Sequence, residues 1–280
     1  MALTLMYITN SPEVAEVAEK CGVDRIWIDL ETLGKEERQK GMNTVKSQHC
    51  VGDIRKIKPL LKKAELLVRV NPWNGESVEE INRVIAAGAD IIMLPMWKSA
   101  EEVKNFLDAV GGRCKTTLLL ETREAVECLD EVLEQGGMNE IHIGLNDLHL
   151  SYGLTFMFEL LSNGVVERLC RKMEEKGVPY GFGGIARLGS GDLPAERIIM
   201  EHYRLHSTRA ILSRSFCNTE YVRDIKEINE LFDKNMCQLR EYEKLVEKCS
   251  KEELLKNKYE IQTAVEKIVK AKKEKKNGYR

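Results

Sequence analysis

Eight short apolar runs, separated by amphipathic helical patterns, constrain the fold of this 280-residue chain more than any other feature. The runs are rich in Leu, Ile and Val, as in parallel strands that are buried on both faces. Many of the segments between them begin with Ser, Thr or Asp and end with Gly, as capped helices do. The alternation predicts parallel strands joined by right-handed helical crossovers. The predicted strands are Leu3–Thr9, Arg25–Leu30, Leu66–Val70, Ile91–Pro95, Thr116–Glu121, Glu140–Leu145, Tyr180–Ile185 and Ala210–Arg214.

Eight parallel strands are the number that closes a TIM barrel. The sequence therefore predicts an α/β fold, a (β/α)8 TIM barrel with extra C-terminal helices, whose catalytic domain spans residues 1–248. An open doubly wound sheet is the alternative. The first strand is not followed by a GxGxxG motif, which argues against a dinucleotide-binding sheet.

Residues 249–280 are predicted to form a helical tail beyond the barrel. Ser250 and Glu253 have the spacing of a capping box, and an apolar stripe follows at helical spacing. Such a stripe needs a surface to cover it. We expect a homo-oligomer in which the tail packs on a neighbouring barrel, an arrangement that includes exchange of the tail between subunits. Packing on its own barrel is the alternative. The stripe comprises Leu254, Ile261, Val265 and Ile268.

The overall composition excludes several kinds of partner. The formal net charge is −2, from 43 basic and 45 acidic residues, so neither nucleic acid nor an anionic membrane is expected as a partner. The eight cysteines contain no CxxC pair and are predicted to be reduced thiols. The N-terminus lacks a basic leader, and no apolar run reaches the length of a membrane span. These features predict a soluble cytoplasmic protein. The basic last residues are interpreted as a solvated end.

Two acids close neighbouring predicted strands. Glu121 ends the run KTTLLLE, and Asp147 ends EIHIGLND. The carboxyl ends of barrel strands form the face where TIM barrels build their sites. Two carboxylates there predict a hard divalent cation, Mg²⁺ or Mn²⁺, with open positions for a ligand. A helix cap or a salt bridge is the alternative for each acid alone.

Arg69 and His49 are the other candidate functional residues. Arg69 lies in the third predicted strand, and its planar guanidinium matches an anionic ligand such as a carboxylate. Balancing buried acids is its alternative role. His49 follows the second strand and is a candidate acid or base, with a surface-loop histidine as the alternative. The second strand itself ends in Asp29 and Glu31.

Five segments, DRIWIDLE, LLVRVN, GADIIMLPM, LLLETREAVECLDEV and HIGLNDLHLSYG, resemble successive motifs of the HpcH/HpaI aldolase and citrate lyase beta-subunit family over residues 1–215. The resemblance implies a phosphoenolpyruvate/pyruvate-type TIM barrel that binds Mg²⁺ or Mn²⁺ through Glu121 and Asp147. It implies that Arg69 lies near the oxygens of the keto acid, and that backbone amides around Gly144, Asn146 and Asp147 hold the substrate carboxylate. The implied activity is a metal-dependent carbon–carbon lyase, an aldolase or citrate-lyase-like enzyme, that acts on a 2-oxo acid or acyl-CoA through an enolate.

The sequence departs from that family at one position. In the pyruvate aldolases a histidine follows the acid at the end of the second strand, whereas Thr32 stands here. This favours citrate-lyase-like members, which do not use the histidine, and leaves the general base unassigned. The alternatives are a non-catalytic metal- and keto-acid-binding barrel, or another pyruvate/phosphoenolpyruvate-type reaction. Family members commonly form trimers or hexamers with exchanged C-terminal helices, which the resemblance adds in support of a homo-oligomer.

Overall fold

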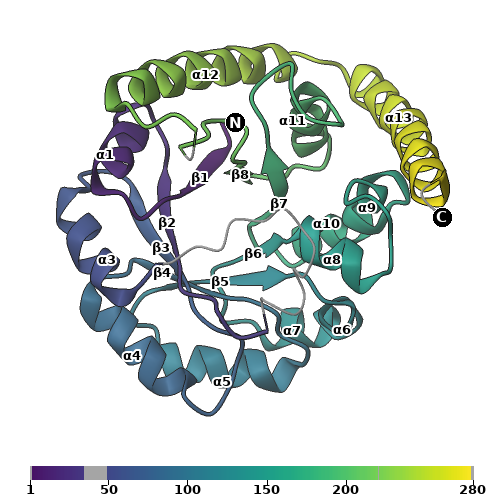
Figure 1. Cartoon of the computed structure of the whole chain (residues 1–280). Helices are drawn as coiled ribbons and strands as arrows, with labels where there is room; N and C mark the ends of the chain where they lie inside the picture. The colour runs from purple at the N-terminus through teal and green to yellow at the C-terminus, as the bar shows by residue number, and fades with distance from the viewer. Residues whose placement is uncertain (1, 35–48, 220, 279–280) are drawn as a thin grey trace.

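The chain forms one closed parallel barrel (Figure 1). We describe residues 2–34, 49–219 and 221–278 of a computed structural model. Each strand pairs with the next in chain order, and β8 pairs with β1, which confirms the TIM barrel and rules out the open sheet. The strands are β1 (Thr4–Ile8), β2 (Arg25–Asp29), β3 (Glu65–Arg69), β4 (Ile91–Leu94), β5 (Lys115–Leu120), β6 (Glu140–Ile143), β7 (Tyr180–Ile185) and β8 (Arg209–Leu212).

Helices form a ring outside the barrel (Figure 1). Two of the segments between strands form a pair of helices with a break between them. One breaks at Cys128, and the other at Gly164, whose φ of 77° lies in the left-handed region that favours glycine. The helices are α1 (Pro12–Lys20), α3 (Val51–Ile57), η1 (Lys58–Leu60), α4 (Ser77–Ala87), α5 (Ala100–Val110), α6 (Arg123–Glu127), α7 (Leu129–Gln135), α8 (Leu145–Ser151), α9 (Glu159–Ser162), α10 (Val165–Glu175), α11 (Ala195–Arg204), α12 (Ile225–Val246) and α13 (Lys251–Gly278).

Strand register separates the outer core from the barrel interior. The pairings align Ile8 with Trp27, Trp27 with Leu67, and Leu67 with Ile91, so these side chains lie on one face of the sheet. Together with Met6, Met93 and Leu119 they form an apolar cluster that is distinct from the larger core beneath the helices. Because alternate residues face inward, the same register predicts which residues at each strand end point into the barrel.

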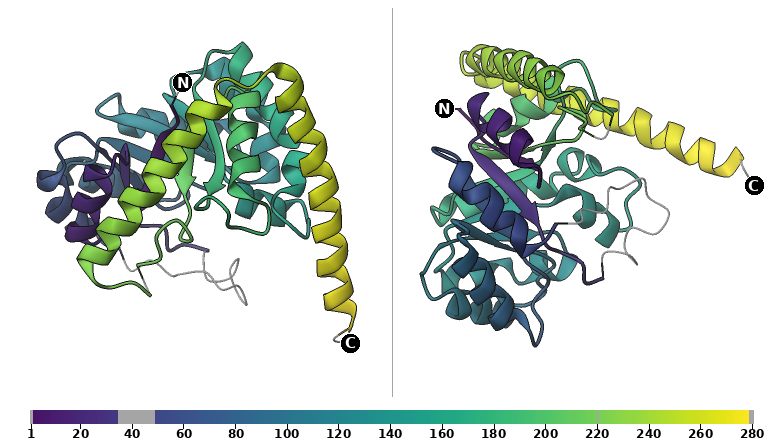
Figure 2. Two further views of the ribbon diagram at one scale, coloured as in Figure 1. Left: turned by 90° about the horizontal axis from the view of Figure 1, so that it is seen from above. Right: turned by 60° about the vertical axis from the view of Figure 1, so that its left-hand side comes forward.

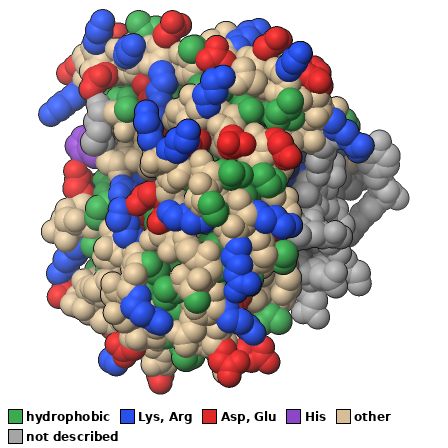
Figure 3. Space-filling model, turned by 90° about the vertical axis from the view of Figure 1, so that its left-hand side faces the viewer, with side chains coloured by type: hydrophobic (Ala, Val, Ile, Leu, Met, Phe, Trp, Pro, Cys, Tyr) green, Lys and Arg blue, Asp and Glu red, His purple; other side chains and the backbone are tan. Residues whose placement is uncertain are grey.

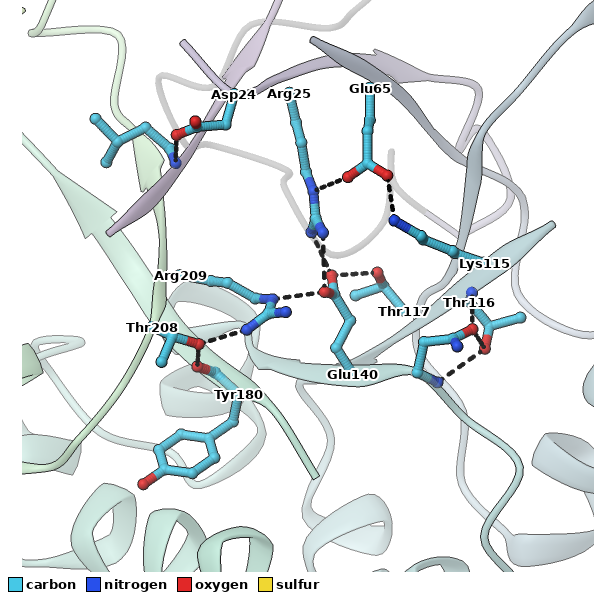
Figure 4. A network of polar contacts seen from close by, with 12 residues as sticks. Asp24, Arg25, Glu65, Lys115, Thr116, Thr117, Glu140, Tyr180, Thr208 and Arg209 are labelled. Carbon is cyan, nitrogen blue, oxygen red and sulfur yellow. Dashed lines mark hydrogen bonds and ion pairs between the residues drawn. The ribbon is translucent and has the colours of Figure 1, made fainter. Parts of the chain in front are cut away.

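An ion network fills the N-terminal end of the barrel (Figure 4). Glu140 accepts hydrogen bonds from Arg25 Nη1 and Nη2 at 2.5 and 3.0 Å and from Arg209 Nε at 2.5 Å. Arg25 Nε and Lys115 Nζ both donate to Glu65, at 3.1 and 2.5 Å. Burial acts to raise the pKa of Glu140, but the hydrogen bond and charge of Arg25 outweigh it, so the pKa is lowered. The network therefore holds Glu140 ionised between two cations.

The C-terminal helix packs on its own barrel over the first half of its length. Ile261 and Val265 are buried, and α13 contacts α9 and α11. Asn257, also buried, donates to Arg197 O at 3.0 Å and to Glu201 Oε1 at 3.2 Å. The predicted apolar stripe is thus covered within the chain, and the far end of α13 runs past the barrel (Figure 2). A single chain does not test the homo-oligomer, which stays a prediction.

Other features of the surface and core match an ordinary globular barrel. All eight cysteines are free thiols. Basic and acidic side chains are interspersed over the face near α1 and α3, and the apolar side chains there are scattered (Figure 3). None of the described helices is both long and apolar enough to cross a membrane.

Candidate active site

Glu121 lies at the C-terminal end of the barrel, directly after β5, and its side chain is buried. Its Oε1 accepts a hydrogen bond from the amide of Met96, at 3.2 Å. Met96 has a φ of 54°, an uncommon backbone conformation for a residue other than glycine. The backbone after β4 is therefore turned so that its amide reaches the carboxylate at the end of the next strand.

Gly144 makes the room that Glu121 occupies. A Cβ atom at position 144 would lie 2.7 Å from Glu121 Oε2 and 2.9 Å from Glu121 Cβ, closer than real Cβ atoms approach other atoms. The amide of Gly144 donates to Leu120 O at 2.9 Å, as part of the β5–β6 pairing. The role that the structure gives Gly144 is thus steric. Any contact of backbone amides with a ligand falls to the residues that follow.

Asp147 and Asn146 lie in the first turn of α8, immediately after β6, and both side chains are half-buried. Since β5 and β6 are neighbours, Glu121 and Asp147 come from adjacent strand ends, as predicted. His149, in the same helix, has its Nδ1 3.3 Å from Leu145 O, which is a contact within α8.

Arg69, the last residue of β3, is held by two acids from the end of β2. Its Nε and Nη2 donate to Asp29 Oδ1 and Oδ2 at 2.8 and 2.9 Å, and Nη2 lies 3.1 Å from Glu31 Oε2. The three side chains are 11%, 2% and 1% exposed. The guanidinium carbon lies 5.3 Å from the centre of the Trp27 ring. The guanidinium is therefore fixed in place by a bidentate pair, a second acid and an aromatic ring.

Charge, not burial, decides the protonation of Arg69. Burial acts to lower its pKa, but the charges of Asp29 and Glu31 and a further contribution from Glu121 raise it. Arg69 is thus a permanent cation among acids. The charge of Glu121 acts on it across the mouth of the barrel.

His49 also lies at this end of the barrel. Its Nδ1 accepts a hydrogen bond from the amide of Asp29, at 2.9 Å. A neutral imidazole that accepts at Nδ1 carries its proton on Nε2. In this arrangement His49 is suited to donate from Nε2 and not to take a proton there. The hydrogen bond therefore makes Nε2 the donor atom of the neutral ring, and the acid/base role of His49 stays a prediction.

Two further histidines, His142 and His202, are part of the scaffold. His142 lies in β6 with its Nε2 3.2 Å from Gly183 O, and burial lowers its pKa to about 4. His202 in α11 stacks on Phe182, with ring centroids 3.9 Å apart. These two histidines are fully buried, so they belong to the core and not to the site.

The donor set suits a hard cation. Glu121 and Asp147 offer carboxylate oxygens, the ligands that Mg²⁺ and Mn²⁺ prefer, and Gly144 keeps the space beside Glu121 clear. In the described parts of the chain, no group of three or more His, Cys, Asp and Glu side chains is arranged to hold a metal. Two protein carboxylates are consistent with magnesium sites, which usually keep several waters and use one or two carboxylates.

Asp29 and Glu31 are the functional residues that the sequence reasoning left out of the site. They were noted as acids at a strand end, and they fill the alternative role given to Arg69, which was to balance buried acids. The sequence pattern could have placed Asp29 inside the barrel. Residues 27 and 29 share a face of β2, and Trp27 points into the interior. No spacing rule predicts that Glu31, beyond the strand, turns back to the same guanidinium.

A cavity of about 540 Å³ opens at the opposite end of the barrel, lined in part by Glu65, Arg113, Lys115 and Thr116. Its Glu65 and Lys115 pair with each other. TIM barrels place their sites at the other end, and the acids considered above lie there. We therefore assign the candidate site to the C-terminal end.

The fold and the site define a class of protein: a TIM barrel with a buried arginine and several carboxylates at the C-terminal mouth. The sequence model of the HpcH/HpaI aldolase/citrate lyase family matches residues 3–157. The chain belongs to this family, which supports a lyase of the aldolase or citrate lyase type. No curated protein matches the chain in sequence.

Solved structures of the same family share the barrel. The HpcH/HpaI aldolase from Desulfitobacterium hafniense DCB-2 superposes with a TM-score of 0.61 at 15% identity, over 82% of this chain and 93% of that one. An HpcH/HpaI aldolase/citrate lyase family protein from Burkholderia cenocepacia J2315 gives 0.59 at 13% identity, over 81% and 95%. At such low identity these matches support the fold and leave the substrate open.

Proposed function

We propose that this protein is a metal-dependent carbon–carbon lyase that acts on a 2-oxo acid or an acyl-CoA through an enolate. The observation that carries the proposal is the fixed guanidinium of Arg69 beside the buried carboxylate of Glu121. Cleavage next to a carbonyl leaves negative charge on the carbonyl oxygen. A preorganised cation near that oxygen stabilises the charge without having to reorganise.

In this proposal Arg69 binds the oxygens of the substrate. Asp29 and Glu31 hold the guanidinium from one side, so its remaining N–H groups define where an anionic oxygen can approach. His49, with its proton on Nε2, supplies a hydrogen bond to the negative charge that develops on the substrate. The general base is not assigned to a side chain.

Glu121 and Asp147 would hold Mg²⁺ or Mn²⁺. When bound, such a cation supplies Lewis-acid stabilisation of negative charge on the substrate oxygen. The chemistry of the two carboxylates and the space kept by Gly144 support this assignment, as does the general metal dependence of the family.

Two glycines provide a matched test of the metal site. Gly144→Ala should weaken Mn²⁺ binding at least about tenfold, because the new methyl group displaces the Glu121 carboxylate. Gly75→Ala is the control, since a Cβ there meets nothing within 4 Å. The double variant Glu121→Ala/Asp147→Ala should lose binding altogether. Calorimetric titration with Mn²⁺ measures all of them, and unchanged affinity in the double variant would refute the site.

Enolate formation can be measured without knowing the carbon acceptor. In D₂O with Mg²⁺, the methyl protons of pyruvate or of acetyl-CoA should exchange with solvent in the presence of the protein, as followed by proton NMR. Arg69→Ala should abolish the exchange. A protein that binds Mn²⁺ and pyruvate, but exchanges neither substrate, would be a non-catalytic binding barrel, and the lyase proposal would be wrong.

Assembly into a homo-oligomer is a separate proposal. The first half of α13 is used within the chain, so the contact would have to involve other surface, such as the exposed Leu255 and Tyr259 on α13. Light scattering on the full chain tests this. A monomer at micromolar concentration would rule it out, whereas loss of assembly in Leu255→Glu/Tyr259→Glu would place the contact on α13.

A further inference from the structure

We propose that Asn71 is a positioning residue that joins the ends of β2 and β3 and so fixes the geometry of Arg69 and Glu31. The inference rests on the proposed function, because it assigns Asn71 a role in ligand binding at that site. Asn71 lies two residues beyond Arg69, just after β3 ends. Its side chain connects three separate parts of the chain.

On one side, Asn71 holds the segment that leaves β2. Its Oδ1 accepts hydrogen bonds from Thr32 N at 2.9 Å, Thr32 Oγ1 at 3.2 Å and Leu33 N at 3.0 Å. Three donors thus converge on one amide oxygen. Thr32 and Leu33 are exposed, so without this acceptor water could take these hydrogen bonds and the segment would lose three of its ties to β3.

On the other side, Asn71 is anchored to α4 by Glu80. The side-chain Nδ2 of Asn71 donates to Glu80 Oε1 at 2.9 Å. The backbone N–H of Asn71 also donates to Glu80, with the nitrogen 3.3 and 3.2 Å from Oε1 and Oε2. Glu80 is buried, at 9% exposure. The donors to Glu80 fix which way the Asn71 amide group faces, and therefore keep Oδ1 turned towards Thr32 and Leu33.

This connection matters for the site because of what lies next to it. Glu31, whose carboxylate is 3.1 Å from Arg69 Nη2, immediately precedes Thr32. The two strand ends are also paired through Leu30 N and Arg69 O, at 2.9 Å. Besides that backbone bond, Asn71 accepts the three hydrogen bonds that hold Thr32 and Leu33, next to Glu31, against the end of β3. Loss of these ties would let Glu31 move and would loosen one of the two acids that aim the guanidinium.

The chain offers a matched control at the other end of the barrel. Asn139 Oδ1 accepts from Thr116 N at 2.8 Å and Thr116 Oγ1 at 3.2 Å, the same pair of bonds that Asn71 makes with Thr32. Asn139→Ala should therefore lose comparable hydrogen bonds without touching the candidate site. The two alanine variants therefore remove the same kind of asparagine–threonine hydrogen bonds, one at each end of the barrel.

The test uses Mn²⁺ and oxalate, a planar dianion that resembles the enolate of pyruvate. Asn71→Ala should weaken oxalate binding to the Mn²⁺-loaded protein about tenfold. Mn²⁺ affinity itself should stay within about twofold, because Asn71 contacts neither carboxylate ligand. Asn139→Ala should change neither constant. Melting temperatures of both variants report the structural loss that they share.

A swap variant distinguishes positioning from general damage. Asn71→Asp keeps the acceptor for Thr32 but sets two carboxylates against each other, so oxalate binding should fall. Adding Glu80→Gln restores a donor opposite the new acid, and the double variant should recover oxalate affinity to within about threefold of the natural protein. In the methyl-exchange assay, the same order should appear in KM for pyruvate.

The outcomes separate the two proposals. If the natural protein binds neither Mn²⁺ nor oxalate, the proposed function fails and this inference fails with it. If it binds both, and Asn71→Ala binds oxalate as tightly as Asn139→Ala does, the positioning role is wrong while the proposed function stands. A swap variant no better than Asn71→Asp alone would also overturn the role, because the Asn71–Glu80 pair would then not be what sets the geometry.

Discussion

The two ends of the barrel use the same kinds of side chain in opposite proportions. At the N-terminal end one acid, Glu140, lies between two arginines, Arg25 and Arg209. At the C-terminal end one arginine, Arg69, lies between two acids, with a third acid, Glu121, close enough to act on its pKa. Both hubs are buried and well hydrogen-bonded. They differ in the sign of the charge at the centre of the cluster, which is an acid at one end and an arginine at the other.

That difference indicates which end is built for a ligand. At the N-terminal end the central carboxylate is saturated by donors from three residues, Arg25, Arg209 and Thr117, at 2.5–3.0 Å. At the C-terminal end acids exceed the arginine among the residues named, three to one. Carboxylate oxygens are also the ligands that hard divalent cations prefer. The first arrangement stabilises the fold, whereas the second is suited to bind a metal and an anionic ligand together.

The largest effect is expected from Glu140→Ala. Removing the acid takes both hydrogen bonds to Glu140 from the Arg25 guanidinium, which keeps only Glu65, and removes the carboxylate partner of Arg209; this should cost about 3–5 kcal/mol of unfolding free energy. Glu140→Gln, which keeps an acceptor, should cost less. Urea denaturation measures both. The Mn²⁺ affinity of the folded Glu140→Gln protein should be unchanged. A loss of affinity would contradict the conclusion that the N-terminal end supports only the fold.

Arg69→Lys should show the reverse pattern. Lysine keeps a positive charge between Asp29 and Glu31, so the unfolding free energy should change little. Lysine cannot reproduce the bidentate geometry of the guanidinium. The resulting fall in kcat/KM for methyl exchange should correspond to a loss of about 2–4 kcal/mol of transition-state stabilisation. Arg123→Lys, at an exposed surface pair, is the control. Normal turnover by Arg69→Lys would refute its role at the substrate.

A pH effect is expected from His142 in the barrel interior. Its pKa is about 4 in the folded protein, against an ordinary value of 6.5, so the unfolded chain binds its proton first as pH falls. The stability that His142 contributes is complete above pH 6.5 and is lost as pH drops towards 4. From pH 7 to pH 5 the loss should be about 2 kcal/mol.

His142→Gln measures this contribution, because glutamine keeps a donor for Gly183 O and does not titrate. The difference between the two unfolding free energies, measured in urea at pH 7 and pH 5, isolates the histidine from the many carboxylates. An identical loss in both proteins would mean that His142 does not titrate in this range.

The smallest effect concerns a residue near the C-terminal mouth that lies outside the acidic cluster. Ser99 Oγ accepts from Glu102 N at 3.2 Å and caps α5. Ser99→Ala should cost about 1 kcal/mol of unfolding free energy and leave Mn²⁺ affinity unchanged. Thermal denaturation and titration together check it. A change in Mn²⁺ affinity would show that the cap of α5 also contributes to the metal site.

The sequence by itself determined the barrel, because apolar strands and capped amphipathic helices are local patterns. The predicted strands differ from the observed ones by no more than two residues at either end. It also placed Glu121 and Asp147 on neighbouring strand ends, since chain order and strand order coincide in this fold. The cap at Ser250 followed from spacing alone: its Oγ accepts from Glu253 N, and its amide donates to Glu253.

Only the tertiary structure decided how those residues are used. Three contacts at the site are between residues that are distant in the chain. They are the ion pair of Arg69 with Glu31, the close approach of Gly144 to Glu121, and the hydrogen bond from Asp29 that sets the tautomer of His49. The packing of α13 on its own barrel depends on the shape of α9 and α11. Periodicity reports which face of an element is buried, but not what that face meets, because the distance between two side chains depends on every turn between them.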